Sequence, residues 1–298
     1  MNRPSETAAS AALAQLFAQA AELLGRLEKL LPAAPAEPDW SAANAFRWRG
    51  TAHPEPLQPI RRPHRLALAD LLGVETQKRE LDRNTRQFLR GLPANNALLW
   101  GAKGTGKSSL VKALLTEYGD LGLRLIEVDR QHLMELPDIL EFLYPRPEKF
   151  ILYCDDLSFE ADDAGYKALK AILEGSLSAP PANVLIYATS NRRHLLPEYP
   201  EDNRQARWIE GELHQGEAVE EKISLSERFG LWLSFHPFTQ DQYLNVVRHW
   251  LERLGTCPSD WETARAEALR YALLRGSRSG RVAFQFAKDW SGRKGLGD

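Results

Sequence analysis

The stretch LLWGAKGTGKSSLVKALL, residues 98–115, has residue types at a spacing suited to holding nucleotide phosphates. Its glycines let the backbone curl so that several N–H groups and the N-terminus of a helix converge on phosphate oxygens. Lys107 brings a positive charge to the β- and γ-phosphates, and the Ser108 hydroxyl is placed to bind Mg²⁺. The sequence therefore predicts that ATP and Mg²⁺ bind at a loop containing Gly101, Lys103, Gly104, Thr105, Gly106, Lys107, Ser108 and Ser109.

A pair of carboxylates, Asp155 and Asp156, follows the apolar run FILYC. A magnesium ion beside Ser108 needs an oxygen ligand opposite it, and we expect Asp155 to hold the water shell of the ion. Asp156 is then expected beside the water that attacks the phosphate. A pair of solvated loop aspartates is the other interpretation, and Glu160 is the other candidate for positioning the water.

Asn191 follows the next apolar run, VLIYATS. Side chains at the carboxyl ends of neighbouring parallel strands face the same crevice, so we expect Asn191 to contact the γ-phosphate or the attacking water. A turn-forming asparagine is the alternative. Arg192, Arg193 and His194 come next, and without interleaved aromatic residues they favour a solvated or subunit-facing turn over a nucleic-acid site.

Short apolar runs that alternate with helical patterns must position these residues. The runs are apolar on consecutive residues, which is typical of strands covered on both faces of a parallel sheet. One run leads directly into the phosphate loop and an apolar helix follows it, as the G-x-x-x-x-G-K-S pattern requires. The sequence thus predicts an α/β fold of the P-loop type with a doubly wound parallel sheet, whose strands lie at 97–100, 123–128, 150–154 and 183–189.

Three helical patterns follow residue 236, and we expect no further strand there. The first has Thr239 as its N-cap and Gly255 at its end. The patterns therefore predict a small C-terminal helical domain, with helices at 239–255, 260–276 and 279–290.

An amphipathic helix and a proline-rich segment precede the core. The apolar stripe of the helix predicts that it is covered by its own domain or by a second copy, with docking to another protein as the alternative. Seven prolines between residues 32 and 63 favour an extended linker, strapped along the core by Trp40, Phe46 and Trp48. The apolar stripe of the helix consists of Leu13, Leu16, Phe17, Ala20, Leu24, Leu27 and Leu31. Together these patterns predict three parts of the chain: the N-terminal helix and linker at 1–65, the α/β core at 66–236 and the helical domain at 237–298.

The composition of the chain indicates which kinds of partner and which cellular compartment to expect. The formal charge of −2 among 298 residues does not favour nucleic acid as a partner, although it leaves room for a local basic patch. With two cysteines, the chain has too few for a disulfide framework, which fits a reducing cytoplasm. We find no apolar run of 18 residues and therefore expect no insertion into a membrane.

Taken in order along the chain, these features resemble the AAA+ ATPase module. The resemblance spans about residues 66–295 and includes the phosphate loop, the Asp155–Asp156 pair, Asn191, the segment ERFG and the segment GSRSGR. More narrowly, four stretches resemble a bacterial family of AAA+ ATP-binding proteins with no assigned physiological role. The stretches are LLWGAKGTGKSSLVKALL, FILYCDDLSFE, VLIYATSNRRHLLPEY and EKISLSERFGLWLSFHPF.

The resemblance implies further roles by position. Asn191 would be the residue that senses the γ-phosphate, and either Arg281 or Arg278 would be the arginine with which the helical lid contacts the nucleotide. Arg228 would be an arginine finger given to a neighbouring subunit of a homo-oligomer. Ion pairing at the surface is the alternative for each of the three arginines. The stretch LALADLLGVETQKREL would line the adenine pocket through Leu72, Gly73 and Val74.

The sequence departs from the AAA+ pattern at two places. AAA+ ATPases usually carry Asp-Glu where this chain has Asp155-Asp156, and the shorter side chain predicts slow turnover. The core has no aromatic pore-loop motif, which disfavours a machine that threads an unfolded substrate. The leading interpretation is an oligomeric ATPase acting on an unidentified protein client. A nucleotide-gated binding module, a loader acting on DNA or a DNA-bound protein, and a P-loop kinase are the alternatives.

Overall fold

A seven-stranded sheet forms the centre of the molecule, in the order β2-β1-β4-β5-β6-β3-β9. The computed structural model describes residues 15–23, 26, 38–159, 163–175, 181–193, 195, 207–209, 212–214, 225–256 and 261–296. All neighbouring strands of this sheet are parallel except β1 and β2. This arrangement confirms the predicted P-loop type of fold. The strands are β1 (Ala45–Trp48), β2 (Leu57–Pro59), β3 (Ala97–Gly101), β4 (Leu123–Glu127), β5 (Lys149–Cys154), β6 (Val184–Ser190) and β9 (Leu231–Phe235).

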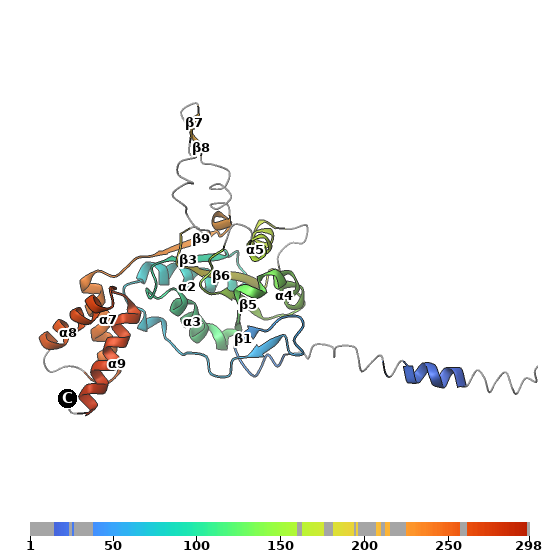
Figure 1. Cartoon of the computed structure of the whole chain (residues 1–298), viewed down its shortest axis with the longest axis horizontal. Coiled ribbons are helices and arrows are strands. Elements are labelled where there is room, and N and C mark those ends of the chain that lie inside the picture. The colour runs from blue at the N-terminus through green and yellow to red at the C-terminus, as the bar shows by residue number, and fades with distance from the viewer. Residues whose placement is uncertain are drawn as a thin grey trace, which may run out of the picture.

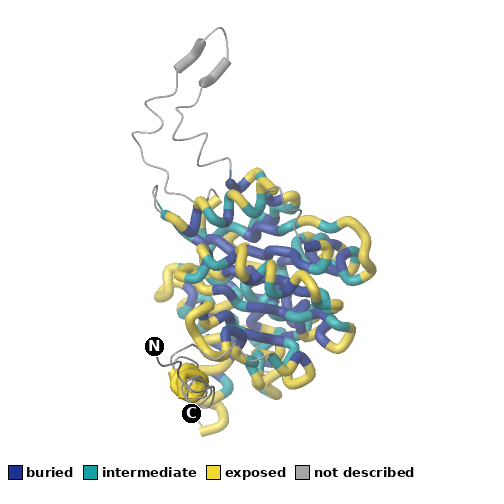
Figure 2. The backbone as a smooth tube through the Cα atoms, turned by 90° about the vertical axis from the view of Figure 1, so that its right-hand side faces the viewer, coloured by how far each residue is buried: buried dark blue, intermediate teal, exposed yellow. Residues whose placement is uncertain are grey.

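Helices cover both faces of the sheet (Figure 1). Alternate residues of β5, such as Ile151 and Leu152, belong to different apolar clusters, one on each face. The consecutive apolar runs in the sequence are therefore explained by burial on two sides. Figure 2 shows this buried backbone running through the middle of the molecule. The helices are α2 (Glu75–Leu89) and α3 (Lys107–Tyr118) on one face, and α4 (Leu136–Leu143) and α5 (Ala164–Glu174) on the other.

The proline-rich segment contributes two strands rather than an extended linker alone. β1 pairs in parallel with β4, and β2 pairs antiparallel with β1 at the edge of the sheet. Trp40, Phe46 and Trp48 are buried, as the strap interpretation requires. Prolines such as Pro59 are tolerated because β2 is an edge strand. The strand β9 was not among the four strands predicted from the sequence. Its run LWLSF is short and is interrupted by a polar residue, Ser234.

Residues 15–23 are helical, as predicted, and Leu16, Phe17 and Ala20, the described members of the predicted apolar stripe, are exposed. The covering of this stripe by its own domain is thus not seen for these residues. The other predicted stripe positions Leu13, Leu24, Leu27 and Leu31, together with Glu160 and His194, lie outside the described residues.

Three C-terminal helices form a group beside the sheet, drawn in orange to red in Figure 1. They are α7 (Gln240–Arg253), α8 (Trp261–Leu274) and α9 (Gly280–Leu296). Thr239 is the N-cap of α7, as predicted. Its hydroxyl accepts a hydrogen bond from the backbone N–H of Gln242, and the backbone N–H of Thr239 donates to the side-chain oxygen of Gln242. Gly255 follows α7 with a φ of +73°, a conformation that favours glycine.

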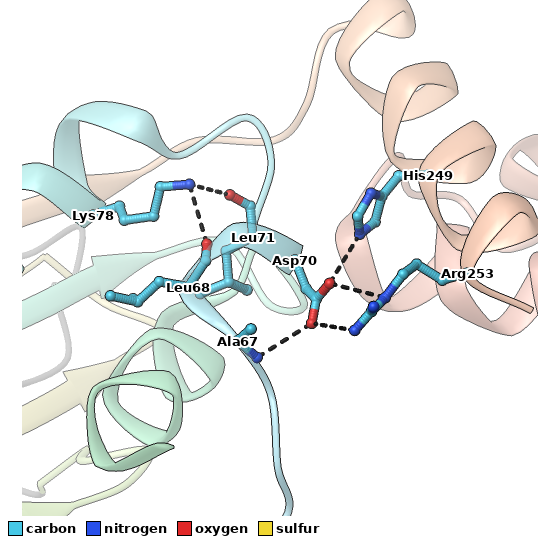
Figure 3. Close-up of polar contacts among 7 residues, drawn as sticks. All are labelled: Ala67, Leu68, Asp70, Leu71, Lys78, His249 and Arg253. Atoms are coloured by element: carbon cyan, nitrogen blue, oxygen red, sulfur yellow. Dashed lines mark hydrogen bonds and ion pairs between the residues drawn. The ribbon is translucent and has the colours of Figure 1, made fainter. Parts of the chain in front are cut away.

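A buried carboxylate ties this helical group to the sheet (Figure 3). Asp70, which is 7% exposed, lies in the short 3₁₀ helix η1 (Leu68–Asp70). On α7, the imidazole Nε2 of His249 lies 3.3 Å from Asp70 Oδ1, and the Arg253 guanidinium contacts both carboxylate oxygens at 3.2 Å. Lys78 of α2 holds the same turn by donating to the carbonyls of Leu68 and Leu71. The core and the helical group therefore meet at a defined polar contact.

A small hairpin of β7 (Arg207–Ile209) and β8 (Glu212–His214) stands apart from the main sheet (Figure 1). It falls in the long polar stretch between Asn191 and Arg228. Two further 3₁₀ helices, η2 (Gly119–Leu121) and η3 (Arg130–Glu135), connect elements of the core. Among the helices within the described ranges, none has the length and apolar character needed to cross a membrane.

Candidate functional site

The phosphate loop connects β3 to α3 and is shaped by glycines. Gly101, Gly104 and Gly106 have φ angles of +129°, +77° and +106°. A Cβ atom on Gly101 would lie 2.0 Å from the carbonyl oxygen of Phe235, so the close approach of β3 to β9 requires glycine there. Thr105 closes the loop by donating its hydroxyl to the carbonyl of Ala102 at 2.8 Å. The loop therefore leads directly into α3, which begins at Lys107.

Lys107 lies buried at the centre of this loop, with 6% of its surface exposed. Its ammonium donates to the carbonyls of Gly101 and Ala102 at 2.7 and 2.8 Å and to the Asn191 side-chain oxygen at 3.1 Å. Burial lowers the pKa of Lys107, while the nearby carboxylates of Asp156 and Asp155 act in the opposite direction. The ammonium is thus held where anionic oxygens entering the loop would meet it.

Asp155 lies at the end of β5, opposite the start of α3. Its Oδ1 accepts hydrogen bonds from the hydroxyls of Ser108 at 2.7 Å and Thr189 at 2.6 Å. Burial by itself raises the pKa of Asp155, but hydrogen bonds from neighbouring hydroxyls, Thr189 first among them, hold the pKa below its ordinary value. A deprotonated carboxylate beside a serine hydroxyl is the oxygen donor set that Mg²⁺ prefers, so these residues fit the ion. No larger cluster of metal-binding side chains occurs in the described part of the chain.

Asp156 has an unusual backbone conformation for a residue with a side chain, with a φ of +51°. Its N–H donates to the Thr189 hydroxyl at 2.9 Å, and its carboxylate accepts a hydrogen bond from the Asn191 amide. Asn191 therefore links Lys107 to Asp156. Strained residues of this kind gather at functional sites, where the surrounding contacts hold them in place.

The start of α9 closes over the phosphate loop. The Arg281 N–H donates to the carbonyl of Gly104 at 3.2 Å. A Cβ on Gly104 would lie 2.8 Å from the Ser279 hydroxyl oxygen and 3.2 Å from Arg281 Cβ, which explains glycine at this contact. The N-terminus of a helix, with its free N–H groups and positive dipole end, thus faces the loop from the side of the helical group.

A cleft of about 420 Å³ lies between the core and the helical group. Carboxylates, Lys107 and Arg281 line one part of it, and an apolar wall lines the other. In this wall the rings of Trp250 and Phe284 lie 4.6 Å apart, between their centroids. The apolar part is of a kind that accepts a flat base, and it is lined by Leu66, Leu71, Leu72, Val74, Phe238, Val246, Trp250 and Phe284.

The structure brings most predicted residues to this cleft but not all. Leu72, Val74, Lys103, Thr105 and Ser109 line it together with the residues already described. Gly73 lies beside the Phe238 ring and does not itself line the cleft. Both candidate lid arginines are exposed, but only Arg281 lines the cleft. Arg228 forms an ion pair with Glu174 of α5 in the same chain, away from the cleft lining.

Several lining residues had no individual signal in the sequence. Thr189, which contacts both Asp155 and Asp156, was visible only as the penultimate residue of the strand that Asn191 follows. Trp250 belongs to the apolar stripe of α7, and a stripe does not reveal which of its members faces a cleft rather than a core. His64 follows the last proline of the proline-rich segment, and Leu66 and Asp70 belong to the stretch that the resemblance gave to the adenine pocket only through Leu72, Gly73 and Val74.

The sheet order, the phosphate loop and the C-terminal helical group form a P-loop fold of the AAA+ type, and the expected resemblance to this fold is confirmed. The chain belongs to the family described as "Protein of unknown function (DUF815)", which matches residues 41–294.

Solved structures of RuvB from Thermotoga maritima are similar to this chain. One has 17% sequence identity and a TM-score of 0.51, and covers 74% of this chain. A second has 16% identity, the same TM-score of 0.51 and the same 74% coverage. The aligned part is 63% of each RuvB chain, less than two thirds of its length. The similarity at this identity shows the fold. A search of curated proteins found no match.

Proposed function

We propose that this protein is an ATPase that couples ATP hydrolysis to movement between the core and the helical lid, acting as a homo-oligomer on a macromolecular partner. The observation that carries the proposal is the meeting of Lys107, the Ser108–Asp155 pair, Asn191 and Arg281 at one cleft between these two parts. The proposed units are a nucleotide-binding core of residues 66–236 joined by β1 and β2, a lid of residues 237–298, and an N-terminal segment.

In this mechanism the phosphates replace protein groups that now occupy the loop. Lys107 exchanges the carbonyls of Gly101 and Ala102 for oxygens of the β- and γ-phosphates. Ser108 and Asp155 would hold Mg²⁺, which would supply charge neutralisation at the phosphates. Asn191 and Asp156 orient the attacking water, and Asp156 accepts its proton. Arg281 brings a second cation to the γ-phosphate from the lid.

A nucleotide-gated binding module with little turnover is the second candidate. The observation in its favour is the Asp156 carboxylate, which is one methylene shorter than the usual glutamate and is already hydrogen-bonded to Asn191. A shorter side chain that is held in place is less able to reach a water. The partner remains a proposal in both cases: we favour a protein client, with DNA as the alternative that the formal charge of −2 disfavours.

The two candidates differ in steady-state phosphate release with Mg²⁺ and ATP. For an ATPase we expect release by the wild-type protein and a loss of about 10²-fold or more in both Asp155→Ala and Asp156→Asn. Asp156→Asn should still bind ATP, since Asp156 contributes no cation or loop amide. Release too slow to exceed the Asp155→Ala background would support the binding module. Parent-rate turnover by Asp156→Asn would transfer the role of base to another residue, such as Glu160.

A further inference from the structure

A second cavity, of about 340 Å³, lies next to the nucleotide cleft. It is enclosed by β1, β4, α3 and the segment that follows β2, and His64 of this segment lines both cavities. Lys112 faces it from α3, one turn after Ser108. The proposed ATPase chemistry uses none of the residues that line this second cavity. The side chains with polar groups include Arg47, Arg62, Arg65, Lys112 and Tyr153.

The charges around this cavity are not balanced. Within the described residues, Arg62, Arg65 and Lys112 make no ion pair with a carboxylate. The Glu127 carboxylate that also lines the cavity is already paired with Arg47 at 2.6 Å. Asp120, the other acidic lining residue, is exposed, as are Arg62 and Arg65, and it is outnumbered by these two arginines and Lys112. The cavity therefore carries an excess of positive charge although the whole chain has a formal charge of −2.

A buried hydroxyl also lacks a partner at this cavity. Tyr153 is 1% exposed, and its hydroxyl completes no hydrogen bond with any described residue. A buried hydroxyl without an acceptor destabilises a protein. An acceptor atom of a ligand would remove this penalty.

We propose that this second cavity binds a phosphorylated small molecule, held by Arg62, Arg65 and Lys112 with the Tyr153 hydroxyl as an additional donor. Two guanidinium groups and an ammonium supply more donors than a single carboxylate accepts, whereas a phosphate with its three terminal oxygens can use them. The volume of about 340 Å³ falls in the range of small-molecule sites and exceeds the need of a free inorganic ion. This inference goes beyond the proposed ATPase function and does not depend on it.

The test is a calorimetric titration with pyrophosphate in a Lys107→Ala background, which weakens phosphate binding at the neighbouring cleft. Adding Arg62→Ala and Arg65→Ala should weaken the remaining pyrophosphate binding at least tenfold. Arg61→Ala is the matched control, because Arg61 is an exposed arginine of the same segment that does not line the cavity. It should change the affinity less than twofold. Tyr153→Phe should weaken binding several-fold while leaving the charge unchanged.

Three results would overturn the proposal: no saturable pyrophosphate binding in the Lys107→Ala protein, no effect of the Arg62 and Arg65 changes, or an equal effect of Arg61→Ala. A parallel titration with AMP identifies the source of the phosphate. Tighter binding than pyrophosphate, with the same dependence on Arg62 and Arg65, indicates a nucleotide, and weaker binding indicates a smaller phosphorylated anion. Failure of the ATPase proposal is distinguishable, since it appears as unchanged MgATP binding by Lys107→Ala.

Discussion

At the scale of residues, the two arginines of the segment GSRSGR differ in position although either fits the sequence pattern. Arg281 lines the cleft at the start of α9, and Arg278 does not line it, although both side chains are exposed. We expect Arg281→Ala to lower the rate of ATP hydrolysis about 10²-fold, because it removes a cation from the developing phosphate charge. Arg278→Ala is the matched control and should stay within twofold of the wild type in the same phosphate-release assay. A reversed order of the two effects would assign the lid contact to Arg278.

The phosphate loop and the Asp155–Asp156 pair were predictable because local spacing alone fixes their geometry. Ser108 and Asp155 meet because α3 begins directly after the loop and β5, one strand removed from β3, ends at the same edge of the sheet. The apolar wall of the cleft was not predictable from spacing. Trp250 and Phe284 come from two helices of the lid, and their meeting at 4.6 Å depends on how those helices pack.

At the scale of elements, the strands β1 and β2 move the N-terminal boundary of the folded core. Phe46 and Trp48 are 0% and 2% exposed, and β1 covers the edge of β4. Deleting residues 1–37 should leave MgATP affinity within twofold, whereas deleting residues 1–60 should destabilise or unfold the protein. Phe46→Ala in the full chain tests the same point without truncation and should cost about 3–5 kcal/mol in urea unfolding. Equal stability of the two truncated proteins would show that β1 and β2 are dispensable.

The Asp70 contact between η1 and α7 is a second element-scale feature. Asp70→Asn keeps the shape of the side chain but removes the charge that His249 and Arg253 face. Because both partners remain partly exposed to solvent, we expect a loss of about 1–2 kcal/mol in the free energy of unfolding, measured with urea. Glu252→Gln, an exposed change on the same helix, is the control and should have almost no effect. A similar small effect of both changes would mean that the contact contributes little to holding the lid.

Element prediction succeeded where a periodic pattern was long and failed where it was short or interrupted. The helices α7 and α8 lie within their predicted ranges of 239–255 and 260–276, whereas α9 continues to Leu296, beyond the predicted end at residue 290. β1 and β2 were interpreted as a linker since they are four and three residues long and lie among prolines. Pairing with β4, a contact distant in sequence, is what makes β1 a strand.

At the scale of the whole molecule, the proposed oligomer depends on Arg228. In the single chain Arg228 pairs with Glu174, so an arginine finger would have to exchange this partner for the nucleotide of a neighbouring subunit. If it does, the hydrolysis rate per subunit should rise with protein concentration, and Arg228→Ala should abolish that rise by removing a group worth about 10³- to 10⁵-fold. Affinity for ATP should change little. Sedimentation as a monomer with ATP present, and a rate per subunit independent of concentration and of Arg228, would contradict the oligomeric ATPase.

The central claim is that the cleft between core and lid binds MgATP through the phosphate loop. Its most direct test is isothermal titration of MgATP into the wild-type protein and into Lys107→Ala, with folding checked by circular dichroism. We predict saturable binding at one site per chain, and affinity reduced by about 10- to 100-fold in Lys107→Ala because a charge-assisted contact to the phosphates is lost. Lys167→Ala, an exposed change on α5, should bind as the wild type does. Equal MgATP affinity of a folded Lys107→Ala protein, or no binding by the wild type, would contradict the account.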